Sequence, residues 1–521
     1  MISIPYAIGH PLPRTTHCVN VSLQKKGKGI APGDLRTIWL LEADLNAGSR
    51  IHFVKRMMND SALNNDLLPQ SQYSKKGSKA SEAAIVKVLF FDILRQTRKP
   101  GVFLASDLHQ CFDRMAHPVC SLVSQRLGVH ENVVKCMITA IQQMKHTVRT
   151  GYGDANEFYG NYEDKPLQGG GQGNGASLPL FVAISCILIS ILESAVKGVY
   201  LRTAMSLTLI HFIAIMYVDD TDILLAALDD TETIYEVIMR AKKAATVWQK
   251  AVLDSGGAVR PDKCYWSAID FAWTSGKWRY KKMTEIAGYI RIRNPDGKLE
   301  TIKRYDLDSA NEGLGVYLTP RGSLNLQLTE TSKKIIEWTT KVVKSSLTHK
   351  ETYVAATTTI FRTIMFILPT CSFSRKQCRV IEVLLYKNLL PKMGVSSKMP
   401  LPYRFAPYQF QGMNLMQVFV HIMIEKLKVF LFHADQPTQL GQTLKASLEA
   451  IQIEVGSKEQ FFSLSYEKYG FLTPFSWLAT LWDALYSYGI SLKPGTWNLK
   501  LPRTNDLALM DAVVDSNLFN R

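Results

Sequence analysis

The sequence predicts a folded protein of mixed α/β (α+β) class. Hydrophobic residues make up 46% of its 521 residues and charged residues 20%, which is the balance of a globular chain. Two apolar runs, 207–218 and 223–228, flank a short acidic turn and predict a strand–turn–strand unit. Long amphipathic helices are predicted at 232–255 and 329–346. Because a chain of this length exceeds one typical core, we expect two to four subdomains.

The charge and cysteine content narrow the class of partner and compartment. Lysine and arginine number 61 against 45 acidic residues, giving a net charge of +16. This excess favours a polyanionic partner, with nucleic acid ahead of a membrane surface. The eight cysteines are scattered, with no Cys-x-x-Cys pair and no Cys/His cluster at zinc spacing. We therefore expect free thiols in a reduced, intracellular compartment.

The N-terminal hundred residues are predicted to contain little regular structure before their first long helix. Residues 1–33 are rich in proline and glycine and are expected to be irregular, apart from a short strand at 19–23. No apolar segment of sufficient length for a secretory signal occurs at the start. A helix is predicted over 78–98, with Ser78 or Ser81 as its N-cap.

A short apolar strand at 102–105 is predicted to deliver Asp107 to the end of a sheet. Helices are expected to follow at 118–127 and 133–144, and a glycine-rich loop region at 151–175. The segments therefore alternate between strands and helices, as expected of a mixed fold.

Residues 176–192 carry no charge, and at about 17 residues they lie at the lower limit for a membrane span. We interpret them as a buried core helix, and we expect no stable membrane association. The amphipathic helix at 232–255 is expected to end at two glycines, and aromatic-rich strands are predicted at 260–273 and 278–292.

The acidic turn Tyr217–Val218–Asp219–Asp220 is the strongest chemical signal. Unpaired carboxylates are costly at the edge of a buried sheet, so a cation is expected to neutralise them. Oxygen ligands suit Mg²⁺, which keeps several waters and takes its other ligands from substrate phosphates. An Asp-Asp pair alone is more often a solvated turn, so its interpretation depends on the rest of the chain.

Asp107 is the best candidate for a carboxylate partner of Asp219. Two metal ions about 3.5–4 Å apart can clamp the attacking and leaving oxygens of a phosphoryl displacement, and bridging them takes carboxylates from neighbouring strands. We expect Asp113 to cap the next helix instead of binding metal. Asp222 and Asp230 are interpreted as solvated turn or cap residues.

A glycine-rich stretch at 168–175 lies between these carboxylates. Its glycines permit close approach of a backbone to a ligand, while Gln172 and Asn174 offer amide donors. In this order the features resemble the palm motifs of the reverse transcriptase family, in particular its non-LTR, retrotransposon-like branch of microbial eukaryotes. The matching segments, first to fifth, are 107–113, Gln172–Gly173 with Ser177, Tyr217–Asp220, 256–264 and 313–317.

Two upstream segments resemble the fingers motifs of that family, at 35–38 and 69–78. The resemblance covers about residues 34–345 and continues more weakly to about 433. This chain departs from the family pattern in two places: Ser177-Leu178-Pro179 replaces a Ser-Pro pair, and Ser74 replaces a glycine.

The resemblance implies a right-hand polymerase with fingers, an antiparallel-sheet palm and a helical thumb, followed by a helical C-terminal extension. The implied division is an irregular segment 1–33, fingers 34–100, a palm 101–325 with a fingers insertion, a thumb-like region 326–433, and an extension 434–521. No endonuclease, zinc knuckle or RNase H pattern is recognised in the sequence.

The resemblance also implies catalytic roles. Asp107 and Asp219, with Asp220 beside them, would hold two Mg²⁺ ions, with Mn²⁺ as a possible substitute. These ions would activate the primer 3′-hydroxyl and stabilise the pyrophosphate leaving group. Lys263 would protonate pyrophosphate as a general acid.

The remaining implied roles concern substrate binding. Arg36 would bind the incoming triphosphate, and Phe112 would stand under its sugar and exclude a 2′-hydroxyl. Gln172 and Gly173 would pack near the nascent base pair. The primer grip would be Gly313, Leu314 and Gly315.

The sequence therefore predicts an RNA-directed DNA polymerase of a retrotransposon-like element that binds an RNA template, a DNA primer and dNTPs. Its expected location is the nucleus or a cytoplasmic ribonucleoprotein. Two alternatives stay open: an RNA-directed RNA polymerase, which usually carries Gly-Asp-Asp, and a catalytically inactive palm that binds nucleic acid as a scaffold. Retention of Asp107, Asp219 and Asp220 argues against the scaffold.

Overall fold

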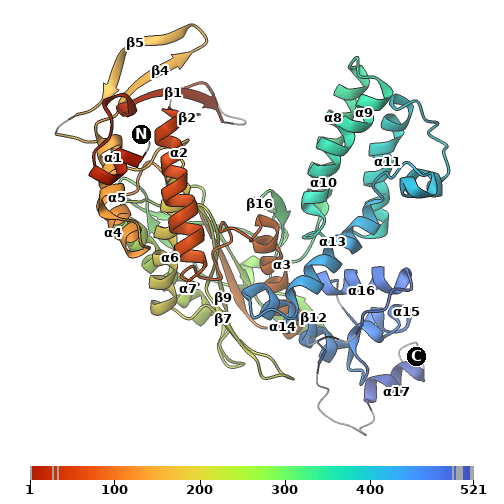
Figure 1. Ribbon diagram of the computed structural model, residues 1–521. Coiled ribbons are helices and arrows are strands. Elements are labelled where there is room, and N and C mark those ends of the chain that lie inside the picture. The colour runs from red at the N-terminus through yellow and green to blue at the C-terminus, as the bar shows by residue number, and fades with distance from the viewer. Residues whose placement is uncertain are drawn as a thin grey trace.

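Two arms rise from a shared base in the computed structural model (Figure 1). One arm carries the N-terminal sheet and the other is built from helices after residue 324. The structure describes residues 3–25, 29–31, 34–162, 164–473, 475–493, 495, 498–499 and 508–516. The predicted α/β class is confirmed at the level of secondary structure, because long helices accompany several sheets.

The N-terminal arm is built on a four-stranded sheet in the order β2-β1-β4-β5. Its strands are β1 (His17–Gln24), β2 (Leu35–Leu41), β4 (Lys145–Thr150) and β5 (Gly153–Gly160). The strand predicted at 19–23 is confirmed as part of β1, but the remainder of segment 1–33, expected to be irregular, also holds the helix α1 (Ser3–Ile8). The expected loop 151–175 is wrong where β5 forms.

Strand β1 reaches beyond its predicted bounds because it pairs with β2 from Cys18 to Gln24 and with β4 from His17 to Val21. In β5 all residues but the last are exposed, so pairing with β4 and not burial makes it a strand. Helices of this arm are α2 (Ala43–Ser49), the continuing π-helix η3 (Arg50–Leu63), α4 (His117–Arg126) and α5 (Glu131–Gln142).

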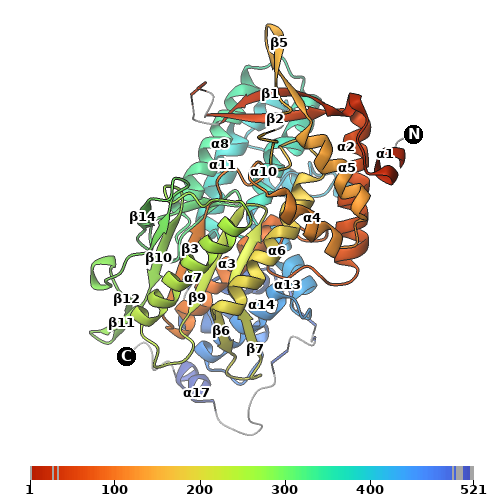
Figure 2. The ribbon, with the colours of Figure 1, turned by 90° about the vertical axis from the view of Figure 1, so that its left-hand side faces the viewer.

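The base contains a five-stranded sheet in the order β15-β10-β3-β9-β8. The strands are β3 (Gly101–Ser106), β8 (Ala214–Tyr217), β9 (Asp220–Ala226), β10 (Tyr265–Ile269) and β15 (Lys303–Arg304). Helices α6 (Ser177–Ala195) and α7 (Ile234–Asp254) lie together across one face of this sheet (Figure 2). The predicted helices 176–192 and 232–255 are confirmed.

Three predicted strands, 207–218, 260–273 and 278–292, are divided in the structure. The run 207–218 splits at Ile213 into β7 (Leu209–Phe212) and β8, because β7 leaves the main sheet to pair with β6 (Val199–Arg202). The run 260–273 splits at Asp270, whose buried carboxylate pairs with Lys281 at 2.6 Å. The run 278–292 forms a strand only at its two ends, in β12 (Lys277–Tyr280) and β13 (Arg291–Arg293). The other small strands after β10 are β11 (Phe271–Thr274), β14 (Leu299–Thr301), β16 (Asn311–Gly313) and β17 (Val316–Leu318).

Within the described residues, α6 is the one helix long and apolar enough to cross a membrane. Twelve of its nineteen residues are buried, and it packs against α7, α4 and η3. Its apolar side chains belong to the same core as the inner faces of β3 and β9. This packing confirms the prediction that residues 176–192 form a buried core helix.

Helix α3 (Ala80–Thr97) runs through the centre of the molecule, and its N-cap prediction is wrong. Neither Ser78 nor Ser81 is the cap; the N-cap is Lys79, whose backbone N–H donates to the Glu82 carboxylate at 3.0 Å. Glu82 therefore satisfies a free amide at the helix start without a serine.

The second arm and the C-terminal region are helical. Their longer helices are α8 (Asn325–Lys344), α9 (His349–Ala355), α10 (Phe361–Ile367), α11 (Arg375–Lys392), α13 (Val418–His433), α14 (Gln439–Val455) and α16 (Trp477–Ser487). Shorter helices are α12 (Leu401–Phe405), α15 (Tyr466–Tyr469) and α17 (Leu509–Asp515).

The C-terminal region is not a separate appendage on the base, because α14 packs along α3. Tyr73 donates from its hydroxyl to Gln439 at 3.0 Å, and the backbone N–H of Trp477 donates to Asp92 at 2.8 Å. Arg98 and Glu454 lie 3.6 Å apart across the same boundary. One hydrophobic cluster accordingly includes α3, β9 and helices on to α17.

Candidate active site

The acidic hairpin is the turn between β8 and β9. Tyr217 pairs with Asp220, so Val218 and Asp219 form a two-residue turn. Val218 has a φ of +57°, a conformation that β-branched residues rarely adopt. Backbone strain of this kind persists where the surrounding structure imposes it, often at a functional site. The turn aims the Asp219 carboxylate away from the buried strand interior, where it stays partly exposed.

Strand β3 brings Asp107 to this hairpin. The strand pairs antiparallel with β9, and its last residue, Ser106, lies opposite Thr221. Asp107 follows directly and therefore lies beside the turn that holds Asp219 and Asp220. Its backbone carbonyl accepts a hydrogen bond from Arg260 at 3.0 Å, which ties the segment 256–264 to the same edge.

The three carboxylates influence one another electrostatically. Burial raises the pKa of Asp107; the Lys263 ammonium opposes this shift and the Asp219 charge adds to it. Burial, followed by repulsion from Asp219 and Asp222, raises the pKa of Asp220 to about 6. Crowded carboxylates with raised pKa values are typical of sites that bind a cation or exchange a proton.

Lys263 lies where the sequence predicts a functional lysine. Its ammonium is 3.3 Å from a carboxylate oxygen of Asp107, and both side chains are partly exposed. The lysine therefore supplies a positive charge to this cluster from the segment that follows α7. Its role as a general acid stays a prediction.

A second lysine at this site was not predicted. Lys87 of α3 is buried, and its ammonium lies 3.0 Å from Asp222 and 4.2 Å from the centre of the Phe103 ring. The expectation that Asp222 is solvated is therefore wrong, because β9 turns it towards α3. The one sequence signal that could have revealed this pair is a lysine within the apolar pattern of a helix. Asp230, by contrast, is 92% exposed, as expected, and pairs with Lys99 at 3.2 Å.

Phe112 lies in the loop after Asp107, half-buried against Phe181 of α6 with ring centres 5.9 Å apart. Its carbonyl accepts a hydrogen bond from Gly170 at 2.7 Å, which joins this loop to the glycine-rich segment. The N-cap role predicted for Asp113 is wrong, because α4 begins after Ala116, whose side chain caps nothing. Burial raises the pKa of Asp113.

The glycine-rich segment is held against β2. The carbonyl of Gln172 accepts a hydrogen bond from the Trp39 backbone at 2.6 Å. A methyl group at Gly173 would lie 2.2 Å from the Trp39 carbonyl oxygen, and Gly173 has a φ of +114°, so only glycine fits. Arg36 lies three residues before Trp39 on the same strand and is exposed. The segment therefore links the predicted triphosphate-binding strand to Phe112.

The predicted primer-grip segment is a tight hairpin. Gly313 pairs with Val316, and the two turn residues, Leu314 and Gly315, have φ values of +56° and +76°, as in a type I′ turn. A methyl group at Gly313 would lie 3.4 Å from the Lys87 ammonium. The hairpin therefore borders the acidic cluster through Lys87.

The donor chemistry fits a divalent cation, since Asp107, Asp219 and Asp220 offer oxygen ligands only. Within the part of the chain that the structure describes, no three Asp, Glu, His or Cys side chains already stand at metal-ligand spacing. Lys263 contacts Asp107 instead.

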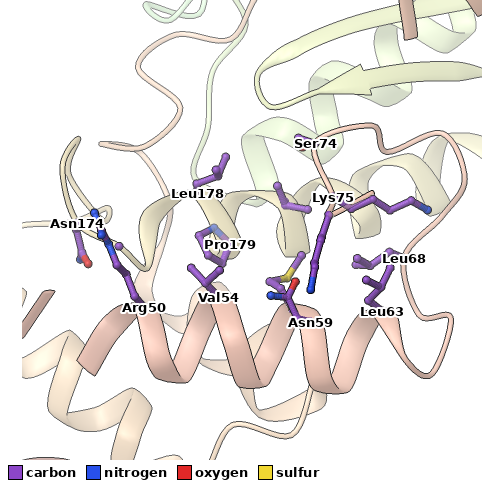
Figure 3. Close-up of a pocket in the computed structure, with 14 residues that line it drawn as sticks. Arg50, Val54, Asn59, Leu63, Leu68, Ser74, Lys75, Asn174, Leu178 and Pro179 are labelled. Carbon is purple, nitrogen blue, oxygen red and sulfur yellow. The ribbon is translucent and has the colours of Figure 1, made fainter. Parts of the chain in front are cut away.

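A pocket of about 520 Å³ opens beside the glycine-rich segment, between η3, the loop 68–76 and the start of α6. Figure 3 shows Arg50 and Asn174 at one end and Lys75 at the other, with Val54 and Pro179 between them. Burial lowers the pKa of Lys75, whose ammonium donates to the Pro69 carbonyl at 3.2 Å. The pocket combines cationic ends with an apolar middle.

The predicted fingers motif at 69–78 forms one wall of this pocket, and its residues 71–73 are buried. Gln72 is fully buried, donates to Ser185 at 2.6 Å, and pairs as an isolated β-bridge with Met216. The next three residues, Ser74, Lys75 and Lys76, line the pocket. Contact of this motif with a template stays a prediction.

No protein-family model and no curated protein sequence matches this chain. Solved structures of telomerase are similar to this chain, with low sequence identities and low TM-scores. Telomerase from Candida albicans, in complex with a TWJ fragment of telomeric RNA, is 12% identical with a TM-score of 0.38, covering 91% of this chain and 66% of that one. The corresponding complex from Candida tropicalis is 12% identical with a TM-score of 0.35, covering 89% and 65%. This chain thus spans about two thirds of the length of those chains.

Proposed function

We propose that this protein is an RNA-directed DNA polymerase that adds dNTPs to a primer 3′-hydroxyl. The observation that carries the proposal is the position of Asp107 beside the Asp219–Asp220 turn, at the common edge of β3, β8 and β9. Three carboxylates on neighbouring antiparallel strands are the arrangement that two-metal phosphoryl transfer requires.

Asp107, Asp219 and Asp220 are the residues that would hold Mg²⁺, or Mn²⁺ in its place. When bound, such ions lower the pKa of the attacking hydroxyl and neutralise charge on the leaving pyrophosphate. Lys263, which contacts Asp107 in this structure, would donate a proton to that leaving group. Burial is the main cause of the raised pKa of Asp220; repulsion from Asp219 and Asp222 adds to it, and a bound cation would oppose this repulsion.

The substrate roles follow from the surrounding elements. Arg36 on β2 is exposed and free to bind triphosphate oxygens, and Gln172 lies on the segment bonded to that strand. Phe112 is held firmly enough by Phe181 to act as a steric barrier below a sugar. Leu314 and Gly315 at the tip of a rigid turn would position the primer end.

The template strand would pass the pocket beside Asn174. Its cationic ends suit phosphates, and its apolar middle suits an unpaired base. The finer hypothesis, a polymerase of a non-LTR, retrotransposon-like element in the nucleus or a cytoplasmic ribonucleoprotein, rests on the motif pattern alone.

Primer extension tests the proposal. Purified protein with a poly(rA)/oligo(dT) template-primer and Mg²⁺ is expected to incorporate dTTP, and Asp219→Asn is expected to abolish incorporation while template-primer affinity changes less than about threefold. Absence of incorporation by folded wild-type protein would contradict the proposal. Collapse of binding in Asp219→Asn would show that the residue is structural, and efficient incorporation of UTP in place of dTTP would favour an RNA polymerase.

A further inference from the structure

Two exposed tryptophans stand on a small ribbon outside the candidate active site. Trp273 and Trp278 pair across β11 and β12 with ring centres 5.3 Å apart in an edge-to-face contact. They are 60% and 50% exposed. The turn that joins their strands, Ser275–Gly276, has φ values of +52° and +75°, so the ribbon is a tight type I′ hairpin. Large aromatic surfaces left exposed on a rigid support are typical of binding sites.

A third exposed aromatic side chain lies on the next hairpin. Tyr289 is 52% exposed and precedes β13. The Lys242 ammonium lies 4.3 Å from its ring centre and the Arg291 guanidinium 4.8 Å from it. Tyr289 thus combines a half-exposed ring with two adjacent positive charges that can contact a ligand phosphate.

The segment that holds these rings is strongly basic. Residues 271–305 contain nine lysines and arginines against three acidic residues. Two cations near the ribbon are neutralised: Arg279 pairs with Glu285 at 2.7 Å, and Lys281 with Asp270 at 2.6 Å. Within the described chain no carboxylate forms an ion pair with the remaining exposed cations, which are Lys277, Lys282, Arg291, Arg293, Lys298 and Lys303.

Both hairpins lie on the same side of the base in Figure 2, with β11 and β12 at its lower end and β14 higher up. The candidate carboxylates belong instead to the turn between β8 and β9 and to the end of β3. The name "hairpin face" is used here for Trp273, Trp278 and Tyr289 with the cations of residues 277–298.

We propose that the hairpin face is a second nucleic-acid-binding surface, which takes a single strand. Unpaired bases stack on the three aromatic rings while the neighbouring cations contact the phosphates. A duplex has its bases paired and stacked, so it gains only the phosphate contacts. Excess positive charge beside exposed aromatic rings matches a polyanion with free bases. The surface does not depend on the catalytic carboxylates, so it goes beyond the proposed polymerase activity.

The test is a binding assay in which the polymerase site is kept occupied. Fluorescein-labelled oligo(U) and oligo(dT) of about 12 nucleotides, within the range of single-strand sites, are titrated with full-length protein. A saturating excess of unlabelled RNA–DNA hybrid duplex is present throughout. Trp273→Ala with Trp278→Ala is expected to weaken binding at least about fivefold, the effect of losing one stacked base. Tyr152→Ala, at an exposed tyrosine of the N-terminal arm, is the matched control and is expected to leave binding unchanged.

Two further measurements complete the test. Photocrosslinking with 5-iodouridine strands is expected to label Trp273, Trp278 or Tyr289, and Lys242→Gln with Arg291→Gln is expected to reduce the salt dependence of binding. A change of less than twofold in the tryptophan variant, or crosslinks confined to other segments, would overturn the proposal. A preference of oligo(U) over oligo(dT), or the reverse, identifies the strand as RNA or DNA. Failure of dTTP incorporation would not affect this assay, so the two proposals fail separately.

Discussion

The ammonium of Lys263 lies 3.3 Å from the carboxylate of Asp107, although the proposed reaction gives each a different partner. Asp107 is proposed to bind a cation and Lys263 to protonate the leaving group. The ion pair is therefore a resting arrangement that must open before catalysis. Since both side chains are partly exposed, opening it costs little.

Lys263→Ala is expected to lower the single-turnover rate of dTTP incorporation by about 100-fold or more, because a general acid contributes about 10²–10⁴-fold. Lys263→Arg keeps the charge but supplies a much weaker acid, so it is expected to preserve dNTP affinity without restoring the rate. Rates are measured against pH with the exposed Lys165→Ala as control. A wild-type rate in Lys263→Ala would remove the general-acid assignment.

Phe112→Ala is expected to raise incorporation of UTP relative to dTTP by at least tenfold, since the ring proposed to clash with a 2′-hydroxyl is lost. The loss of its contact with Phe181 should cost about 1–3 kcal/mol of stability. Competition between labelled UTP and dTTP measures the ratio. Phe112→Tyr, which retains the ring, is the control; unchanged discrimination in the alanine variant would show that Phe112 serves packing alone.

The pair Lys87–Asp222 is expected to behave as a coupled unit in a double-mutant cycle. Lys87→Met leaves the Asp222 carboxylate unpaired close to Asp220 and should cost about 3 kcal/mol in free energy of unfolding. Adding Asp222→Asn should recover most of that loss. Urea denaturation of the four proteins gives the coupling energy, and additive effects would show that the two residues act independently.

Glu454 predicts a pH dependence of stability. Burial raises its pKa to about 7, and Arg98 opposes the shift. The folded state then binds more protons than the unfolded state between about pH 4.5 and 7, so the free energy of unfolding falls as pH rises through this window. Across this window the free energy of unfolding falls by at most about 3 kcal/mol, and Glu454→Gln is expected to remove that fall. Denaturation at pH 5 and pH 8 measures it; an unchanged pH profile would contradict the assignment to Glu454.

The sequence predicts the elements with strong apolar periodicity. Helices α6 and α7 and strand β3 form close to their expected bounds, because burial of one face decides their structure. The meeting of Asp107 with the acidic turn is also predictable, since each carboxylate directly follows a buried strand.

Other features depend on tertiary contacts that leave little trace in the sequence. Strand β5 exists through pairing with β4 and not through burial. In the sequence Lys87 is an ordinary polar residue of a helix. Its ion pair with Asp222 becomes apparent only when α3 is placed against β9. Asp113 has the residue type of an N-cap, but α4 begins only after Ala116, so Asp113 lies in the loop before the helix. The packing of α14 on α3 is equally invisible, because it joins segments distant in sequence.

That last contact has a consequence for how the protein is made. Helix α3 ends at Thr97, whereas its partner α14 begins at Gln439, more than three hundred residues later. During translation the apolar side of α3 stays without this partner until more than three hundred further residues have been made, and meanwhile it is exposed to non-specific association. A chain that stops before α14 would keep this surface uncovered. Synthesis of α14, and not completion of the acidic hairpin, is therefore the step that allows this surface to be covered.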